Sequence, residues 1–143
     1  MGMSWVMAYE NIPQTLTAAL ISLAGGSEIG ILLIINAVLL LVGTVMDMTP
    51  AVLIFTPILL PIVTELGMDP IHFGIVMVLN LCVGLCTPPV GSVLFLGTQI
   101  AETSIERVIR PLFPFFAAML AALLLVTFIP EISLFLPQAF GLL

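Results

Sequence analysis

Residues 80–91 read Asn-Leu-Cys-Val-Gly-Leu-Cys-Thr-Pro-Pro-Val-Gly, and residues 43–50 read Gly-Thr-Val-Met-Asp-Met-Thr-Pro. Both stretches interrupt long apolar runs with glycine, proline, threonine and an amide or carboxylate. In the hydrocarbon core of a membrane, such a break leaves backbone groups without hydrogen-bond partners unless they line a cavity. Paired breaks in apolar helices are typical of transporter binding sites, so the two stretches form the candidate functional site.

The amino-acid composition is that of an integral membrane protein. Hydrophobic residues make up 62% of the 143-residue chain and charged residues 7%, and the mean hydropathy is +1.37. Soluble domains are roughly 45–50% apolar and about 25% charged. A chain of this length has room for only a few spans of about 20 residues, fewer than a transporter built from two repeated halves. We therefore predict an all-α membrane protein that is a fragment or one subunit.

The charge balance and the cysteines exclude two kinds of partner. Two arginines oppose eight acidic residues, which gives a formal net charge of −6. Nucleic-acid binding needs clustered lysine and arginine, so no nucleic-acid partner is expected. Cys82 and Cys86 have no second cysteine pair and no histidine nearby, which argues against a metal site. We interpret both cysteines as small buried hydrophobic residues.

The first half of the chain predicts an amphipathic interfacial arm helix over 10–25 and a re-entrant helical hairpin over 28–66. Asn11 and Pro13 are typical of a helix start, and the arm is too short to span a membrane. The apolar run before Gly43 has about 14 residues, whereas a full crossing needs about 20. Two short arms around a turn indicate a hairpin whose tip stops within the membrane. One long kinked span is the alternative.

A broken transmembrane helix is predicted over 70–101. Asp69, followed by a proline, indicates the helix start. The break falls at 87–91, between apolar halves at 71–85 and 92–100. The two prolines of the break remove two backbone donors, which leaves carbonyls free at the end of the first half-helix. Carbonyls at such an end can coordinate a cation.

The remaining predicted elements are an amphipathic arm helix over 102–110 and a final transmembrane helix over 111–130. Arg107 and Arg110 are the only basic residues of the chain. Positive charge marks the cytoplasmic side of a membrane protein, so this arm is predicted to be cytoplasmic. Counting back through the broken helix places the turn before residue 70 on the outer face. The hairpin is therefore expected to enter the membrane from outside.

Three polar residues within apolar segments need separate interpretation. Asp47 is the only acid deep in an apolar region, and such a residue is a functional hypothesis by default. The alternative for Asp47 is a cap that bonds free backbone N–H groups at the hairpin tip. Asn36 can bond locally, and His72 lies near the outer face. We interpret these two as packing or interfacial residues.

Six short motifs follow one another along the chain. They are Ile-Pro-Gln at 12–14, Gly-x-x-x-Asp at 43–47, Thr-Pro-Ile-Leu-Leu-Pro at 56–61, Gly-x-Asp-Pro-x-His-Phe-Gly at 67–74, Asn-Leu-x-x-Gly-Leu-x-Thr-Pro-Pro-Val-Gly at 80–91 and Glu-Arg-x-x-Arg at 106–110. In this order and at these spacings they resemble the C-terminal part of the TRAP transporter large permease, the DctM-type subunit. The resemblance covers nearly the whole chain, and its specificity lies in the succession of the motifs. It implies that the fold corresponds to one inverted-repeat half.

The resemblance implies a sodium-coupled importer of C4-dicarboxylates or related organic acids, a multi-pass protein of the bacterial inner membrane. It also implies a small permease subunit and a periplasmic substrate-binding protein as partners, contact with membrane lipid, an elevator-like movement, and no cofactor beyond the coupling Na⁺. In the family, one sodium site forms where the hairpin tip meets the broken helix. Matched to this sequence, that site comprises the backbone carbonyls of Gly43, Gly84 and Val90 together with Thr87, whose hydroxyl is also available.

Beside this sodium site, the resemblance places the hairpin tip and part of the substrate site. The second sodium site and much of the substrate pocket belong to the repeat that this sequence does not include. The residues assigned here to the tip and substrate site are Thr44, Asp47, Asn80, Pro88 and Pro89.

Other interpretations of the same residues remain open. Gly43 and Gly84 can simply permit close helix packing, as small residues do in membranes. An intramembrane hydrolase is disfavoured, because the chain has no Ser-His arrangement at membrane depth, no His-Glu-x-x-His and a single deep aspartate. A truncated, transport-inactive membrane fragment is the serious alternative, since half a site cannot run alternating access.

Overall fold

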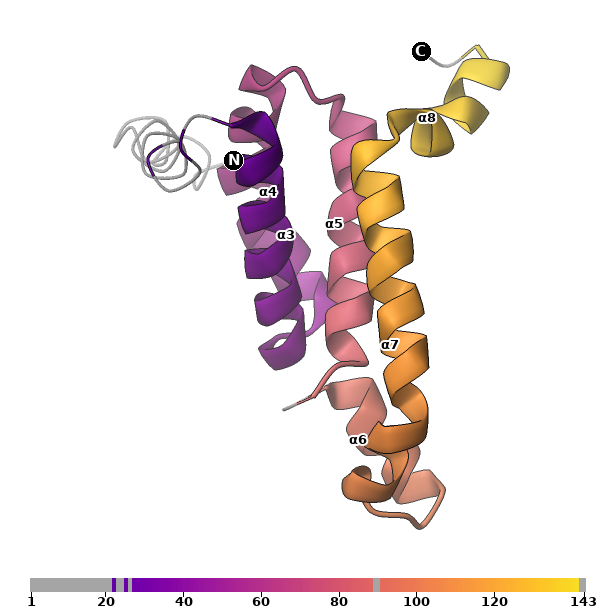
Figure 1. Ribbon diagram of the computed structural model, residues 1–143. Coiled ribbons are helices and arrows are strands. Elements are labelled where there is room, and N and C mark those ends of the chain that lie inside the picture. The colour runs from indigo at the N-terminus through magenta and orange to yellow at the C-terminus, as the bar shows by residue number, and fades with distance from the viewer. Residues whose placement is uncertain (1–21, 23–24, 26, 89–90, 142–143) are drawn as a thin grey trace.

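The computed structural model describes residues 22, 25, 27–88 and 91–141 (Figure 1). This part of the chain is helical apart from short turns and contains no strand, so the predicted all-α class is confirmed. The predicted arm helix over 10–25 lies outside the described residues except for 22 and 25. The described helices are α3 (Glu28–Val45), α4 (Met48–Glu65), α5 (Pro70–Leu85), α6 (Ser92–Ile100), α7 (Ile105–Phe128) and α8 (Pro130–Ala139).

Helices α3 and α4 form a hairpin that turns at Asp47. The sequence predicted that the first arm ends before Gly43, but α3 continues to Val45. Gly43 keeps a helical backbone, and the Thr44 hydroxyl donates to the Leu41 carbonyl within the same helix at 2.7 Å. Each arm therefore has 18 residues and is long and apolar enough to cross a membrane. Arm length alone no longer distinguishes a re-entrant hairpin from two full spans.

The arrangement of the helices bears on that choice (Figure 1). The turn between α3 and α4 lies beside the break between α5 and α6, while α6 and the beginning of α7 extend further along the molecule. The outer ends of both hairpin arms gather with the start of α5 at the opposite end. A turn at the level of a break in a neighbouring helix favours the re-entrant hairpin, which stays a prediction.

Helix α5 is the centre of the fold, because it contacts every other described helix from α3 to α8. The start of α5 agrees with the sequence prediction. Asp69 accepts hydrogen bonds from the N–H groups of Ile71 (2.8 Å) and His72 (3.4 Å), and Pro70 occupies the first turn. One face of α5 packs against both hairpin arms. The buried cluster that results contains Ile31, Ile35, Leu39, Ala51, Leu59, Ile62, Val63, Phe73, Met77 and Leu81.

The opposite face of α5 is exposed at Ile71, Ile75, Val78 and Cys82. The prediction that both cysteines are buried is therefore wrong for Cys82, because no described helix covers this face. Apolar side chains on the outer faces of α3, α4 and α7 are exposed in the same way. Three helices, α3, α4 and α7, meet the length and hydropathy expected of a membrane span. The chain is a membrane protein.

The predicted separation of an arm helix at 102–110 from a final span at 111–130 is wrong. The structure has one helix of 24 residues, α7, with Pro111 and Pro114 inside it. Proline fixes a backbone angle that suits a helix and removes one N–H donor at each position. The carbonyls released in this way belong to Arg107 and Arg110, which lie on the exposed, polar end of the helix. Water or lipid headgroups can satisfy them there, so the helix continues.

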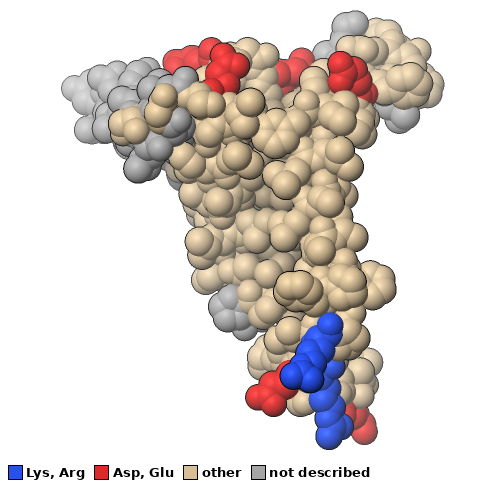
Figure 2. All heavy atoms as spheres, viewed as in Figure 1, with Lys and Arg blue, Asp and Glu red and all other residues tan. Residues whose placement is uncertain are grey.

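In the view of Figure 2, charged side chains gather at the two ends of the molecule, with acidic groups at both ends and basic groups at one. Arg107 and Arg110 lie at the end formed by α6 and the start of α7, whereas Glu28, Glu65 and Asp69 lie at the ends of α3, α4 and α5 that gather at the other end. A broad apolar region lies between. This distribution agrees with a chain that crosses a membrane with its arginines on the cytoplasmic side.

Exposed residues at the helix ends allow a test of topology. In a background carrying Cys82→Ala and Cys86→Ala, we expect Glu28→Cys and Glu65→Cys both to react with an impermeant maleimide added outside intact cells. Ser104→Cys, in the turn before α7, should react only after permeabilisation. Labelling of Glu28→Cys and Glu65→Cys from opposite faces would instead identify the hairpin as containing a through-span.

Candidate functional site

The two predicted breaks meet where α3 crosses α5. Gly43 and Gly84 are both buried at this crossing. A Cβ atom added to Gly84 would lie 2.7 Å from the Cα of Gly43 and 2.8 Å from the carbonyl oxygen of Leu40, and one added to Gly43 would lie 3.0 Å from the carbonyl oxygen of Leu81. Both glycines are helical, so the requirement is for space and not for an unusual backbone angle. The helices touch backbone to backbone.

Immediately after the crossing, α5 ends in a tight turn. Pro88 has no N–H to give to the carbonyl of Gly84, which instead accepts from the N–H of Thr87 at 2.9 Å. The carbonyls at the end of the first half-helix were expected to be free of helical hydrogen bonds, and the Gly84 carbonyl takes this turn hydrogen bond instead, which leaves one lone pair available. The Thr87 hydroxyl donates its proton to the Val83 carbonyl at 2.7 Å. Its oxygen lone pairs therefore stay free to coordinate a cation.

Gly91 connects the second break to the hairpin tip. Its N–H donates to the carbonyl of Thr44 at 3.2 Å, and its φ of +39° lies in the left-handed region that favours glycine. An added Cβ atom would lie 2.8 Å from the carbonyl oxygen of Thr87 and 3.2 Å from that of Leu85. These two carbonyls therefore converge on one point. Sequence reasoning missed Leu85 and Gly91, although the glycine that ends Thr-Pro-Pro-Val-Gly was a visible signal.

Asp47 lies at the hairpin tip but does not cap α4. It occupies the N-cap position without a side-chain hydrogen bond to the helix, so the capping alternative for Asp47 is wrong. One carboxylate oxygen instead accepts from the Ser92 hydroxyl at 3.4 Å. Ser92 is the first residue of α6, so this contact is a second link between the tip and the break.

The structure brings Thr44, Thr87 and Pro88 together in the wall of one cavity of about 480 Å³ between α3 and α7. Asn80 is elsewhere: it is completely buried one turn before Gly84, and its amide donates to Asn36. Pro89 and Val90 lie outside the described residues. The rest of the cavity wall consists of Asn36 and the apolar residues Leu33, Ala37, Leu40, Leu41, Leu120, Leu123 and Leu124.

The donor set around the crossing suits a hard monovalent cation. The described candidates are the carbonyls near Gly43, Gly84 and Thr87 and the Thr87 hydroxyl, which are neutral oxygen ligands. Within the described residues, no group of three His, Cys, Asp or Glu side chains could hold a metal ion. Neutral oxygens at the negative end of a half-helix match Na⁺ better than Zn²⁺, which requires nitrogen, sulfur or carboxylate ligands.

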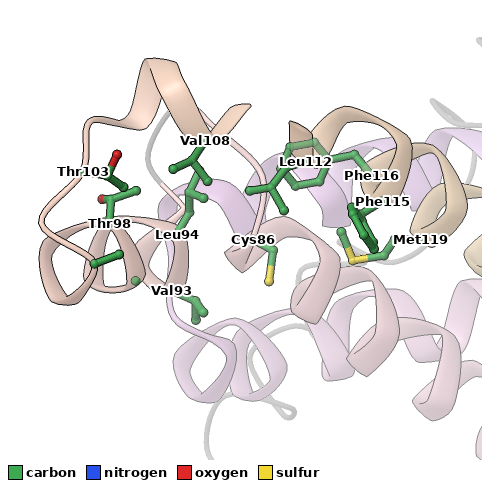
Figure 3. Close-up of a pocket in the computed structure, with 12 residues that line it drawn as sticks. Cys86, Val93, Leu94, Thr98, Thr103, Val108, Leu112, Phe115, Phe116 and Met119 are labelled. Carbon is green, nitrogen blue, oxygen red and sulfur yellow. The ribbon is translucent and has the colours of Figure 1, made fainter. Parts of the chain in front are cut away.

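A second cavity of about 420 Å³ lies between α6 and α7, with Thr98 and Thr103 toward one end, Phe115, Phe116 and Met119 toward the other and Cys86 between them (Figure 3). Its wall contains no charged side chain, and its only hydroxyl-bearing residues are Thr98 and Thr103. The wall is otherwise apolar, and it lies away from the contact between the hairpin tip and the end of α5. The candidate functional site is therefore the cavity at the two breaks.

Comparison with known proteins gives a consistent result. Residues 2–132 match the family described as "Tripartite ATP-independent periplasmic transporter, DctM component". The chain is similar to the uncharacterized protein YgiK of Salmonella typhimurium, with 51% identity over 99% of the chain. It is 46% identical, over 91% of its length, to the isethionate TRAP transporter permease protein DctMQ of Oleidesulfovibrio alaskensis.

A third relative is the C4-dicarboxylate TRAP transporter large permease protein DctM of Rhodobacter capsulatus, with 43% identity over 97% of the chain. The chain spans only 32%, 20% and 31% of the lengths of these three curated relatives, in the order given.

The close crossing predicts a sharp difference between two glycines of the same helix. Gly84→Ala places a Cβ against backbone and should lower the unfolding free energy by about 1–3 kcal/mol. Gly74→Ala is the matched control, because an added Cβ there meets nothing within 4 Å. This control should be neutral or stabilise α5 by about 0.5–1 kcal/mol through helix propensity. Thermal unfolding in detergent measures both, and equal melting temperatures would contradict the close crossing.

Proposed function

The chain belongs to the family of DctM components of tripartite ATP-independent periplasmic transporters, and from this premise we propose that it forms the C-terminal part of a sodium-coupled permease. The family consists of transporter permeases and not of enzymes. The proposed substrates are C4-dicarboxylates or related organic acids, imported across the bacterial inner membrane. The observation that carries the proposal is the backbone contact at Gly43 and Gly84, which sets two interrupted helices against each other.

Four helix ends meet at this contact. Their partial charges support the binding of both the proposed sodium ion and the proposed organic acid. Helices α3 and α5 end here, and α4 and α6 begin here. A helix end carries roughly half an elementary charge, negative at the C-terminus and positive at the N-terminus. The ends of α3 and α5 therefore favour Na⁺, while the starts of α4 and α6 favour the carboxylate of an organic acid.

We assign the sodium ligands to Gly43, Gly84, Val90 and Thr87, as the resemblance implies. Thr87 supports this assignment because its hydroxyl proton is already given to the Val83 carbonyl. Its oxygen can then act as a ligand without losing that bond. The convergence of the Leu85 and Thr87 carbonyls adds a further neutral oxygen to the candidate set.

The proposed substrate contacts are the walls of the cavity that Thr44, Thr87 and Pro88 line. Pro89 belongs to the same break. Asp47 carries a negative charge that would repel an organic acid, and its carboxylate faces Ser92. We therefore assign Asp47 to holding the hairpin tip against α6. Asn80 has no contact with the cavity, and its assigned role is structural.

The proposed partners follow from the family description, which names a tripartite system. They are a small permease subunit and a periplasmic substrate-binding protein. The exposed apolar faces of α3, α4, α5 and α7 supply the surfaces for membrane lipid and for the remainder of the permease. An elevator-like movement would carry the hairpin and the broken helix together, since α3, α4 and α5 share one buried core.

The competing proposal is a transport-inactive membrane fragment. It rests on the share of the curated relatives that the chain covers, which is 32%, 20% and 31% of their lengths. The two proposals differ in the response to sodium. A ligand that binds only the folded state raises stability, so sodium but not potassium should raise the melting temperature of a transport-competent site.

A single hydroxyl tests the sodium site. In the complete permease reconstituted with its partner subunits, we expect Thr87→Val to raise the sodium concentration for half-maximal uptake roughly five- to tenfold, as for the loss of one polar contact. The substitution keeps the side-chain volume while removing the oxygen. Uptake of a radiolabelled C4-dicarboxylate measures the change.

The matched control is Thr98→Val. The Thr98 hydroxyl likewise donates to a nearby backbone carbonyl, that of Phe95 at 2.9 Å, but Thr98 is buried, whereas Thr87 is half-buried, and it lies in α6 away from the crossing. It should leave the sodium dependence unchanged. An unchanged sodium dependence in Thr87→Val, at equal expression, would remove Thr87 from the site.

A further inference from the structure

A second contact between the same helices consists of hydrogen-bonded polar side chains. Asn36 of α3, Asn80 of α5 and Thr127 of α7 are exposed by only 5%, 0% and 3%. The Asn80 amide donates to the Asn36 side-chain carbonyl and to the Val76 backbone carbonyl at 3.0 Å. The Thr127 hydroxyl lies 3.4 Å from the same Asn36 oxygen. One amide oxygen thus links three helices.

The orientation of this oxygen is fixed by its own helix. The amide nitrogen of Asn36 donates to the Leu32 carbonyl at 2.9 Å, so the carbonyl oxygen faces away from that carbonyl, toward α5 and α7. The Thr127 hydroxyl has a single proton, which it shares between Asn36 and the Leu123 carbonyl at 2.8 Å. Asn80 therefore makes the main link to Asn36, and Thr127 makes the weaker one.

Thr127 is also attached to α5 through its backbone. It lies in the last turn of α7, where carbonyls have no partner within the helix. The Nε2 atom of His72 lies 3.3 Å from the Thr127 carbonyl oxygen. A carbonyl can only accept, so Nε2 donates. The contacts of Thr127 with His72 and Asn36 therefore fix the position of the end of α7 along the axes of α3 and α5.

The position of these side chains connects them to the glycine crossing. Asn36 precedes Gly43 by about two helical turns, and Asn80 precedes Gly84 by about one turn, on the faces that α3 and α5 present to each other. Apolar packing in a membrane gives little preference for one register, because lipid is as apolar as leucine. A buried amide bond does give such a preference, since sliding the helices would separate the Asn36 side-chain oxygen from the Asn80 amide and the Thr127 hydroxyl, while the bonds of each amide within its own helix would stay.

We propose that Asn36, Asn80 and Thr127 are positioning residues that fix the register of α3 on α5 and hold the carbonyls near Gly43 and Gly84 at the spacing that binds sodium. The part of this inference that concerns sodium rests on the proposed function. The part that concerns register does not, and the two are measured separately.

Register is measured by cross-linking in the complete permease. The pair Asp47→Cys/Ser92→Cys, in the Cys82→Ala/Cys86→Ala background, places thiols where the tip and α6 contact each other. We expect Asn80→Leu to slow oxidative cross-linking of this pair roughly tenfold and Thr127→Val roughly threefold. The larger factor belongs to Asn80 because its hydrogen bond to Asn36 is the stronger of the two. Thr127→Ser keeps the hydroxyl and should cross-link as the parent does, and so should the control Thr98→Val.

Sodium binding is measured without that cysteine pair. Asn80→Leu and Thr127→Val should raise the sodium concentration for half-maximal uptake by the same factors, with the maximal rate retained within about twofold. A merely structural loss would lower the maximal rate and leave the half-maximal concentration in place, which would overturn the proposal. Parent-like cross-linking in both Asn80→Leu and Thr127→Val would overturn it as well.

The two readouts also distinguish failure of the proposed function from failure of this inference. If the unsubstituted permease shows no dependence on sodium, the sodium site is lost but the cross-linking rates still decide the role of the three residues. If sodium dependence is present and cross-linking is unaffected by either substitution, the proposed function stands and the positioning role is wrong. Should Asn80→Leu fail to insert, the near-isosteric pair Thr127→Val and Thr127→Ser carries the test.

Discussion

The structure depends on the absence of two side chains where α3 crosses α5. An added Cβ at Gly84 would find the backbone of Gly43 only 2.7 Å away. In a membrane, helices gain little from hiding apolar surface, so close packing and hydrogen bonds decide which faces meet. Backbone contact at the two glycines satisfies the first condition, and the bond between Asn36 and Asn80 satisfies the second. Both contacts lie on the interface between α3 and α5. They therefore bring the C-terminal ends of these two helices together.

That meeting of ends solves the backbone problem that each break creates. A helix that stops in hydrocarbon leaves carbonyls without donors, and a helix that starts there leaves N–H groups without acceptors. Here the N–H of Gly91 at the start of α6 is satisfied by the carbonyl of Thr44 near the end of α3. The carbonyl oxygens of Leu85 and Thr87 lie close to Gly91 as well. A cation and an anion bound there together would each lower the cost of burying the other, which is a physical basis for coupling sodium to an organic acid.

The sequence was informative where a residue acts on the backbone within a few positions of itself. Asp69, the paired prolines and the glycines specify turns, breaks and close approach locally, and the structure has α5 and α6 within a residue of the predicted bounds. It was uninformative where side chains choose between partners. Asp47 was interpreted as a cap or as a functional acid, but its partner Ser92 lies in a distant segment. Asn80 was assigned to the tip, and its partner is Asn36. The predicted stop before Pro111 failed because an exposed helix end tolerates lost hydrogen bonds.

The two relatives whose names give a substrate differ in that substrate. Identity to the isethionate permease is 46% and to the C4-dicarboxylate permease 43%, so the chain is about equally similar to transporters named for a sulfonate and for dicarboxylates. The described residues bring together helix ends, whose carbonyls and N–H groups can meet charge of either sign. The side chains of Thr44 and Thr87 lie in the wall of the cavity beside these ends. Because a helix end interacts with charge and not with a particular acid, the same arrangement suits a sulfonate and a carboxylate alike.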